Sequence, residues 1–535
     1  MSLSRRTRYA AVVLAPMLLL FTGCMIGPDF NRPKVAVSDT WLESGDQRVS
    51  TGSAAYRNWW TAFNDPALDR RVEQAYRDNL TLRQAGVRVL QARAQLGIAI
   101  GEVFPQTQQA VGSVQYFRTS DRAESAAVAV GSGAGGNSVF NFWQAQVGVQ
   151  ASWELDFWGR IRRNIQSADA TFLSTLADYD STLVTLTADV ANNYIALRTA
   201  EERIRIAKEN ADAQDGILKI TDVRFKYGTA TQRDVEQART SLLTTQASIP
   251  PLETDRRQAQ DALSVLLGVP PRDLSDVLVG SSGIPASPPQ VIVGIPADLL
   301  RRRPDVRSAE LQAAAQSAQI GVAKGDLLPV FSLNGSLVFV STDLGRFKLS
   351  DMFRWGARSI QAGPSVQWNI LNYGQITNNV RVQDASFQQL LIAYQNAVIS
   401  AQRDVEDNVI AFLRAQDRAE LLAQSVTSAK TALDLAVLQY REGITDFTTV
   451  LTAQNAVLAQ QDSLASTLGS ISTSLVGIYR ALGGGWEIRE GQDFVPPEIK
   501  AEMDRRTNWG GLLAPANYNV PASRQPDGAP RLPDW

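Results

Sequence analysis

The sequence predicts a mostly α-helical chain that also supplies a few membrane-spanning β-strands, arranged as two copies of one structural unit. Three observations support this fold class. An internal repeat covers most of the chain, apolar residues recur at heptad spacing over long proline-free stretches, and two segments alternate strictly between polar and apolar residues. Helices as long as these stretches allow do not fit inside a compact globular domain, so we expect an elongated molecule.

The N-terminal segment has the layout of an export signal. Basic residues precede an apolar run over residues 9–21, and two small residues separate this run from Cys24, the only cysteine. The arrangement resembles a bacterial lipobox, which predicts a signal peptide over residues 1–23 and a covalent lipid on Cys24. A plain signal peptide with an incidental cysteine and a twin-arginine signal at Arg5 and Arg6 are the alternatives. No later stretch reaches the roughly 18 apolar residues of a membrane helix, so any membrane span must consist of strands.

The composition argues against an enzyme and against a nucleic-acid-binding protein. Lys and Arg number 52 against 54 Asp and Glu, and histidine is absent. The balanced charge does not suit a phosphate backbone, and the lack of histidine removes Ser-His catalysis and every His-ligated metal site. The glycine-rich run Gly131–Gly136 is not followed by the Lys-Ser/Thr of a phosphate loop. We therefore expect no catalytic residue, no metal and no cofactor beyond the lipid.

The internal repeat consists of matching sequence blocks in the two halves of the chain. The matching pairs are 94–105 with 318–329, 153–161 with 368–376, and 225–228 with 440–443. The first pair is offset by 224 residues and the other two by 215, so the first copy holds about nine extra residues. We place this insertion near residues 126–138, a Gly/Ala/Ser stretch typical of a loop tip.

The repeat sets the expected domain organisation. Each copy should run helix, strand, loop, strand, long helix, turn, helix. A lipidated N-terminal segment is expected over 24–65 and a Pro-rich tail, irregular or mobile, over 487–535. Repeat 1 covers 66–290, with a strand hairpin at about 106–155 and a helical hairpin at about 159–267. Repeat 2 covers 291–486, with a strand hairpin at about 329–371 and a helical hairpin at about 374–482.

The helices are predicted from heptad spacing and from the absence of proline. In the first helix the apolar residues at 68, 75, 82, 89 and 96 are seven apart, and Pro105 marks its end. No proline occurs from Ala151 to Ile249, so one helix can run from Gly159 to about Tyr227, on the order of 100 Å. Two shorter helices broken near residues 212–216 are the alternative. The counterpart in the second copy runs from Gly374 to about Tyr440.

The alternating segments have the length and polarity of barrel strands. The apolar positions are Trp143, Ala145, Val147, Val149, Ala151 and Trp153 in the first copy and Ile360, Ala362, Pro364, Val366, Trp368 and Ile370 in the second. The intervening residues are neutral Gln, Asn, Ser and Gly, which suits a wet lumen. Tryptophans gather at the strand ends, as in membrane-interface girdles. A soluble sandwich would show the same alternation and remains the alternative.

Four strands are too few to close a barrel, since the smallest known barrels have about eight. Several chains must therefore pool their strands. Three chains with four strands each would supply twelve.

Several motifs together resemble the TolC/OprM family of outer-membrane efflux proteins, and in particular its lipidated NodT-like branch. The motifs are the lipobox followed by residues 27–33, Trp59–Trp60 with Phe63–Leu68, Leu155–Arg160, Leu300–Val306 and Tyr440–Gln454. The resemblance covers nearly the whole chain after the signal peptide.

The resemblance implies a homotrimer with a twelve-stranded barrel in the outer membrane, continuous with a coiled-coil helical tube in the periplasm. It implies partners as well: a periplasmic adaptor and an inner-membrane pump of the resistance-nodulation-division class, from which drugs or other small molecules would pass outward passively. A type I protein-secretion duct of the same architecture and a structural periplasmic coiled-coil tether are the competing functions. No catalytic role is implied.

The resemblance also places two kinds of functional residue at the helix-to-helix turns. Adaptor-docking turns fall on Gly228, Thr229, Gly443 and Ile444. Periplasmic gate positions fall on Asp234, Tyr440, Thr445, Thr448, Thr449 and Thr452. Threonines replace the usual arginine at 445 and the acidic ring at 449 and 452, so we expect closure to rely on helix packing and on an Asp234–Tyr440 hydrogen bond, with Arg233 or Arg441 assisting.

Overall fold

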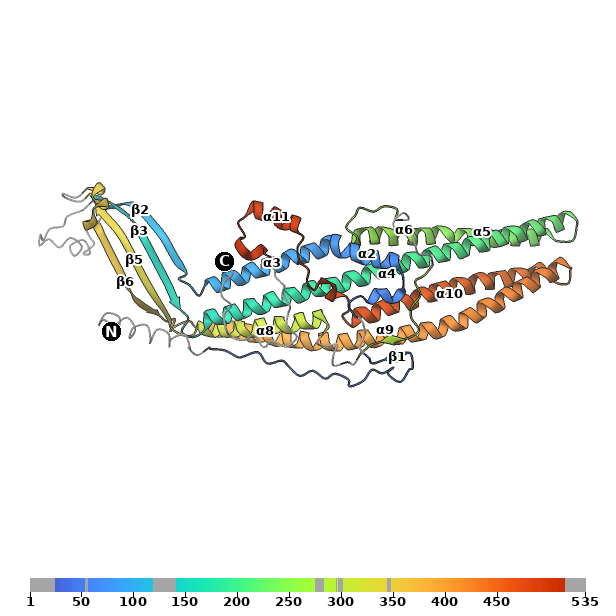
Figure 1. Cartoon of the computed structure of the whole chain (residues 1–535), viewed down its shortest axis with the longest axis horizontal. Coiled ribbons are helices and arrows are strands. Elements are labelled where there is room, and N and C mark those ends of the chain that lie inside the picture. Colours follow the sequence, from blue (N-terminus) through green and yellow to red (C-terminus); the bar gives the residue numbers. More distant parts are fainter. Residues whose placement is uncertain are drawn as a thin grey trace, which may run out of the picture.

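The computed structural model describes residues 25–52, 56–118, 141–274, 283–294, 296, 302–343 and 348–514. The molecule is elongated, with a four-stranded sheet at one end and a bundle of long helices along the rest (Figure 1). Within these ranges, no helix combines the length and the apolar character needed to cross a bilayer. Cys24 and the expected insertion at 126–138 lie outside the described residues.

Two unbroken helices of 67 residues each run the length of the helical bundle, α4 (Arg160–Lys226) and α9 (Gln375–Arg441). Each begins after a glycine with positive φ, Gly159 at 79° and Gly374 at 81°. Glycine adopts this conformation readily, whereas residues with a Cβ incur a steric cost there. The expected continuous helix is therefore present, and the alternative break near 212–216 is not.

The return arms of the two helical hairpins differ. In the second copy α10 (Phe447–Ala481) is one helix, whereas in the first copy α5 (Gln232–Ala247) and α6 (Ile249–Leu266) are separate. Pro250 and Pro251 follow directly on the junction, and proline is favoured in the first turn of a helix but not in its interior.

The expected first helix is also two helices, α2 (Pro66–Asp78) and α3 (Leu80–Gly101), so the prediction of one heptad-spaced helix was wrong. Asn79 separates them. Its carboxamide oxygen accepts from Leu82 N at 2.8 Å and caps α3, while its amide nitrogen donates to Leu266 O at 2.9 Å. Asparagine favours the start of a helix over its interior, because its side chain bonds to nearby backbone N–H groups. The spacing of apolar residues carries no information about such a cap. In the second copy, α8 (Pro304–Gly325) corresponds to α3 alone, at the offset of 224 residues.

The strands form one antiparallel sheet in the order β2-β3-β5-β6. They are β2 (Thr107–Arg118), β3 (Asn141–Leu155), β5 (Val330–Thr342) and β6 (Arg358–Gln367). Strands β2 and β6 are the two edges, and Pro364 lies on the edge strand β6, where a missing N–H is tolerated. A second, two-residue parallel pair joins β1 (Val49–Ser50) to β4 (Val291–Ile292).

Three tryptophans fasten the base of the sheet to the helices. The indole N–H groups of Trp153, Trp158 and Trp368 donate to Val103 O at 3.0 Å, Pro329 O at 2.8 Å and Leu327 O at 3.0 Å. The bonds of Trp153 and Trp368 fall at equivalent places in the two copies. Each ties a strand end to the end of the helix that precedes the hairpin.

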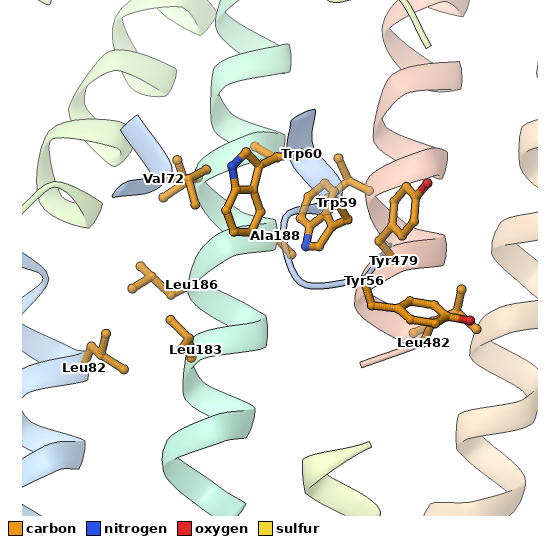
Figure 2. Close-up of a cluster of buried hydrophobic side chains, with 14 of the residues drawn as sticks. Tyr56, Trp59, Trp60, Val72, Leu82, Leu183, Leu186, Ala188, Tyr479 and Leu482 are labelled. Carbon is orange, nitrogen blue, oxygen red and sulfur yellow. The ribbon is translucent and has the colours of Figure 1, made fainter. Parts of the chain in front are cut away.

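The main hydrophobic core lies at the middle of the helical bundle. The 3₁₀ helix η2 (Trp59–Phe63) inserts Trp59 and Trp60 between the helices (Figure 2). The Trp59 ring stacks on Tyr479 with centroids 5.4 Å apart. Gly484 lets the backbone approach closely, because a Cβ there would lie 3.2 Å from both Trp59 Cδ1 and Tyr56 O.

Arg163 of α4 clamps the start of the described chain. Its guanidinium is almost fully buried and donates to Ile26 O at 3.0 Å, Gly27 O at 3.2 Å and the Asp29 carboxylate at 2.8 Å. These contacts hold the N-terminal segment beside the base of the sheet.

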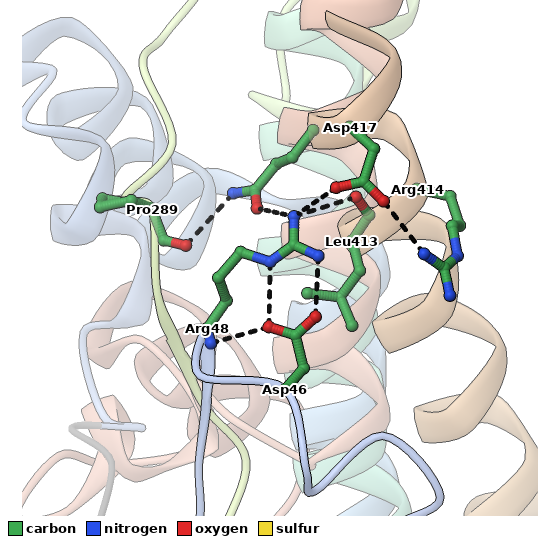
Figure 3. A network of polar contacts seen from close by, with 7 residues as sticks. Asp46, Arg48, Pro289, Leu413, Arg414 and Asp417 are labelled. Atoms are coloured by element: carbon green, nitrogen blue, oxygen red, sulfur yellow. Dashed lines mark hydrogen bonds and ion pairs between the residues drawn. The ribbon is translucent and has the colours of Figure 1, made fainter. Parts of the chain in front are cut away.

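Further along, the same segment crosses α9 and is held by Arg48 (Figure 3). The guanidinium forms a two-pronged contact with Asp46, at 3.0 and 2.8 Å, and reaches Asp417 at 2.8 Å. It also donates to Leu413 O and to the Gln416 carboxamide at 3.4 and 3.3 Å. The N-terminal segment is thus fixed to the helical bundle at both ends.

The described part of the C-terminal segment, residues 487–514, is folded onto the bundle, which corrects the expectation of an irregular or mobile tail for these residues. It contains η6 (Trp486–Arg489), α11 (Pro497–Arg506) and η7 (Gly510–Leu513). Phe494, Val495 and Met503 are buried in the main core. Arg489 forms a two-pronged ion pair with Asp180 of α4, both side chains being buried. Burial raises the pKa of Asp180, and the bonds from Arg489 oppose that shift.

Candidate functional site: the strand faces and the helix tips

The sheet has one mainly polar and one mainly apolar face, which the pairing register continues from strand to strand. On the polar face Ser152 lies opposite Thr107 and Asn334. The Ser152 hydroxyl and the Asn334 carboxamide are 2.7 Å apart, and the same Asn334 donates to Ser365 at 2.7 Å. Because this face is also hollowed, with a lining of mostly neutral polar and small residues, it can surround water without fixing a charge.

The opposite face carries most of the apolar residues of the strands, while Val111, Val338 and Val340 lie on the polar face. Val149 lies between Ala110 of β2 and Leu337 of β5, and Leu337 pairs with Ile360 of β6. Val149 and Ile360 are exposed in the single chain. Strands of ten residues or more are long enough to cross the hydrocarbon core of a bilayer, so the length of this exposed apolar face suits contact with lipid.

The four residues expected to dock onto an adaptor lie at the tips of the two helical hairpins, and the two turns have the same geometry. Gly228 and Gly443 both have φ of 74°. Thr229 N donates to Arg224 O at 2.8 Å, and Ile444 N donates to Gln439 O at 2.9 Å, which closes each helix with a bond between residues five apart. This is the Schellman arrangement, in which a left-handed glycine satisfies the last carbonyls. Ile444 is largely exposed at the tip of the second hairpin.

The expected Asp234–Tyr440 hydrogen bond is absent, and this part of the prediction was wrong. The Asp234 carboxylate instead accepts from Thr231 N at 2.9 Å, while Asp234 N donates to the Thr231 hydroxyl at 3.3 Å. Asp234 is therefore committed to the capping box of α5. The Tyr440 hydroxyl is buried and has no hydrogen-bond partner among the described residues.

Arg224, which the sequence reasoning missed, is the residue that joins the two helical hairpins at Tyr440. Its guanidinium lies 4.5 Å from the centre of the Tyr440 ring and donates to Tyr440 O and, at 3.3 Å, to Arg441 O. A cation at the carboxyl end of α9 is favoured by the helix dipole as well. Gln439 occupies the matching position of the second copy. This difference between the two copies was the one feature of the sequence that could have pointed to Arg224.

The four threonines lie around the start of α10. Thr448, Thr449 and Thr452 are exposed, and Thr445 is half-buried. The Thr445 hydroxyl donates to the Thr449 hydroxyl at 3.0 Å, and Thr449 donates to the Asp446 carboxylate at 3.1 Å. These side chains form an uncharged polar surface, with Asp446 as the acidic group nearest to it in sequence.

Below the tips, the contact between α4 and α10 includes a series of polar pairs. Arg203 forms two bonds with Asp462, at 2.7 and 3.0 Å, and Asn210 donates to Gln461 at 2.8 Å. Farther toward the tip, the contact between the hairpins consists of an apolar cluster that includes Ala238, Tyr440 and Phe447. The two hairpins are therefore held together by a charge pair, a polar pair and an apolar cap in succession.

The chain is similar in sequence to known outer-membrane proteins. The family model described as outer membrane efflux protein matches residues 72–269 and 295–484, that is, both copies of the repeat. The nodulation protein T of Rhizobium leguminosarum bv. viciae is 29% identical over 97% of this chain and 99% of its own. The solvent efflux pump outer membrane protein SrpC of Pseudomonas putida is 32% identical over 88% of this chain and 98% of its own.

Solved structures share the fold. The outer-membrane channel OprN superposes with a TM-score of 0.79 at 30% identity, covering 87% of this chain and 100% of that channel. The CmeC outer-membrane channel of Campylobacter jejuni superposes with a TM-score of 0.78 over 89% of this chain and 100% of its own, and at 23% identity this likeness concerns the fold. With a family model matched over more than half of its length, the chain belongs to the outer membrane efflux protein family.

Proposed function

We propose that three copies of this outer-membrane efflux protein close a twelve-stranded barrel, continuous with a helical tube, through which small molecules leave the cell passively. The observation that carries the proposal is the sheet itself, whose four strands have two open edges, a hollowed polar face and an exposed apolar face. Edge strands left unpaired in lipid would cost several kcal/mol for each unsatisfied backbone group, so pairing between copies removes that cost.

We further propose that the helix tips dock onto a periplasmic adaptor, which links the duct to an inner-membrane pump of the resistance-nodulation-division class. The pump would supply the energy for transport. The neutral polar face of this chain suits passive passage of solutes and would not itself drive them. Relatives are described as solvent, toluene and antibiotic efflux components, which supports small organic molecules as cargo rather than secreted proteins.

A covalent lipid on Cys24 would complete the attachment to the membrane. Arg163 holds Ile26 beside the base of the sheet, and consecutive Cα atoms are about 3.8 Å apart, so a lipid two residues earlier would enter the bilayer near the strands.

The proposed function is tested by deleting the gene in the native host and measuring accumulation of a fluorescent efflux substrate. Accumulation should rise, and a plasmid copy of the wild-type gene should reverse it. Unchanged accumulation of a panel of small organic substrates, with secretion of a protein cargo lost instead, would contradict the proposal and favour a protein-secretion duct.

Arg224→Gln should make the closed duct leaky. The substitution removes a charge-assisted link between the hairpins, worth about 1.5–3 kcal/mol, so the open population should rise on the order of tenfold or more. Single-channel conductance in planar bilayers measures this. Tyr440→Phe is the matched control: its hydroxyl has no partner among the described residues, so its loss should leave the closed state unchanged. A leak from Tyr440→Phe with none from Arg224→Gln would reverse the assignment.

A further inference from the structure

A short segment between β5 and β6 folds back over the apolar face of the sheet at the end remote from the helices. It contains the 3₁₀ helices η4 (Leu349–Phe353) and η5 (Trp355–Ala357). Beneath it Ala145 and Ser341 are only 5% and 8% exposed, although most of the sheet is open in the single chain. The Ser341 hydroxyl donates to Lys348 O at 2.8 Å. The segment therefore lies on the face that the proposed function assigns to lipid.

The strand register places an arginine on that same apolar face. Arg358 pairs with Phe339, which pairs in turn with Val147. The Arg358 guanidinium lies 4.6 Å from the centre of the Trp355 ring and donates to Trp355 O at 2.8 Å, while the Trp355 ring lies 6.3 Å from that of Phe339. A charged side chain in this position is costly in hydrocarbon and suits the level of the lipid head groups.

The exposed surface of the segment combines aromatic and cationic side chains. Phe353 and Trp355 are 80% and 69% exposed. Arg354 is exposed and forms an ion pair with Asp351 at 3.1 Å. Residues 348–358 carry Lys348, Arg354 and Arg358 against the single acidic residue Asp351, a net charge of +2. A surface that combines large exposed apolar rings with excess positive charge is suited to binding an anionic amphiphile, such as a lipid with a phosphorylated head group.

We propose that Lys348, Phe353, Arg354, Trp355 and Arg358 form a binding site for the phosphorylated head group of lipid A, the glycolipid of the outer leaflet. This inference rests on the proposed function, because the end of the sheet remote from the helices faces the outer leaflet only if the helices occupy the periplasm (Figure 1). The planar guanidinium groups match phosphate oxygens in two-pronged contacts, and the two aromatic rings occupy the boundary between head groups and acyl chains. Asp351 and the Trp355 carbonyl hold the two arginines in place.

Native mass spectrometry of the detergent-extracted full-length protein tests the site, with bisphosphorylated lipid A, dephosphorylated lipid A and phosphatidylglycerol as probes. Wild-type protein should retain bisphosphorylated lipid A at least about tenfold more tightly than either of the other two lipids, the difference expected for two charge-assisted contacts. The double variant R354Q/R358Q should lose that preference. The matched control R205Q/R239Q removes two exposed arginines of the helical bundle that are likewise paired within one helical turn, and it should bind like wild type.

Equal retention of the three lipids by wild-type protein, or unchanged binding by R354Q/R358Q, would overturn the proposal. Bilayer conductance of the same preparations separates this failure from a failure of the duct itself. Conductance without a lipid preference refutes the lipid site alone, whereas absence of conductance refutes the duct.

Discussion

Val149→Arg is expected to prevent assembly of the protein in the outer membrane. Val149 lies near the middle of β3, on the apolar face, between Ala110 and Leu337. An arginine on the lipid face of a barrel near the bilayer midplane costs about 2–4 kcal/mol, and in a trimer the cost applies three times. Outer-membrane fractionation, with an assay for a heat-modifiable oligomer on gels, measures the loss.

The adjacent substitution Gln150→Arg supplies the control for Val149→Arg. Gln150 belongs to the polar face and lines its hollow. The same charge there should leave assembly intact and lower cation conductance, because three arginines would face the water of the lumen. The opposite pattern, with Gln150→Arg lost from the membrane and Val149→Arg inserted, would mean that the sheet is inside out.

Arg489→Met is expected to destabilise the fold by about 3–5 kcal/mol, because it leaves the Asp180 carboxylate buried without its cation. Asp180 and Arg489 are 3% and 7% exposed, and they join α4 to the C-terminal segment across 309 residues of sequence. Chemical denaturation of the detergent-solubilised protein measures the loss. The double variant Asp180→Leu/Arg489→Met should recover part of it, since apolar side chains then replace the buried ion pair.

The effect of Arg489→Met should depend on pH. Burial already raises the pKa of Asp180. Removal of Arg489 takes away the hydrogen bonds and the nearer charge that oppose this shift, and only the weaker attraction of Arg307 is left to oppose it. A raised pKa in the folded state stabilises the fold below the unfolded value of about 3.9, and this contribution is lost as the pH rises. The deficit should therefore be smaller near about pH 4 than at neutral pH. Arg505→Met, which alters an exposed arginine of α11, should be close to wild type at both.

The elements with regular periodicity were predictable from the sequence, and those set by single side chains or distant contacts were not. Proline-free heptads from Gly159 predicted α4, and the alternation around Val149 predicted β3 with its polar and apolar faces. The break at Asn79 escaped because the heptad continues through it. The helix α11 escaped because its side chain Met503 packs into the core and its neighbours η6 and η7 contact α4 and α3. No local pattern encodes these distant contacts.

The candidate site divides in the same way. The turns at Gly228 and Gly443 follow from local glycine geometry and were located. The predicted Asp234–Tyr440 hydrogen bond was wrong, although the sequence contained evidence against it. Thr231 lies three residues before Asp234, the spacing of a helix capping box, and such a box occupies the Asp234 carboxylate. Arg224 could not be placed, because its contact with Tyr440 depends on how the two hairpins are aligned side by side.

The central claim is that edge strands β2 and β6 pair between copies, and cysteine crosslinking tests it most directly. One cysteine is placed on β2 and one on β6 of each chain, at positions scanned along both strands. Within one chain β3 and β5 separate the two edges by about 14 Å, too far for a disulfide, which needs Cα atoms within about 7 Å. Oxidation in the membrane should therefore produce a covalent ring of three chains. A product of one chain at every pair, with a monomer in detergent, would contradict the account.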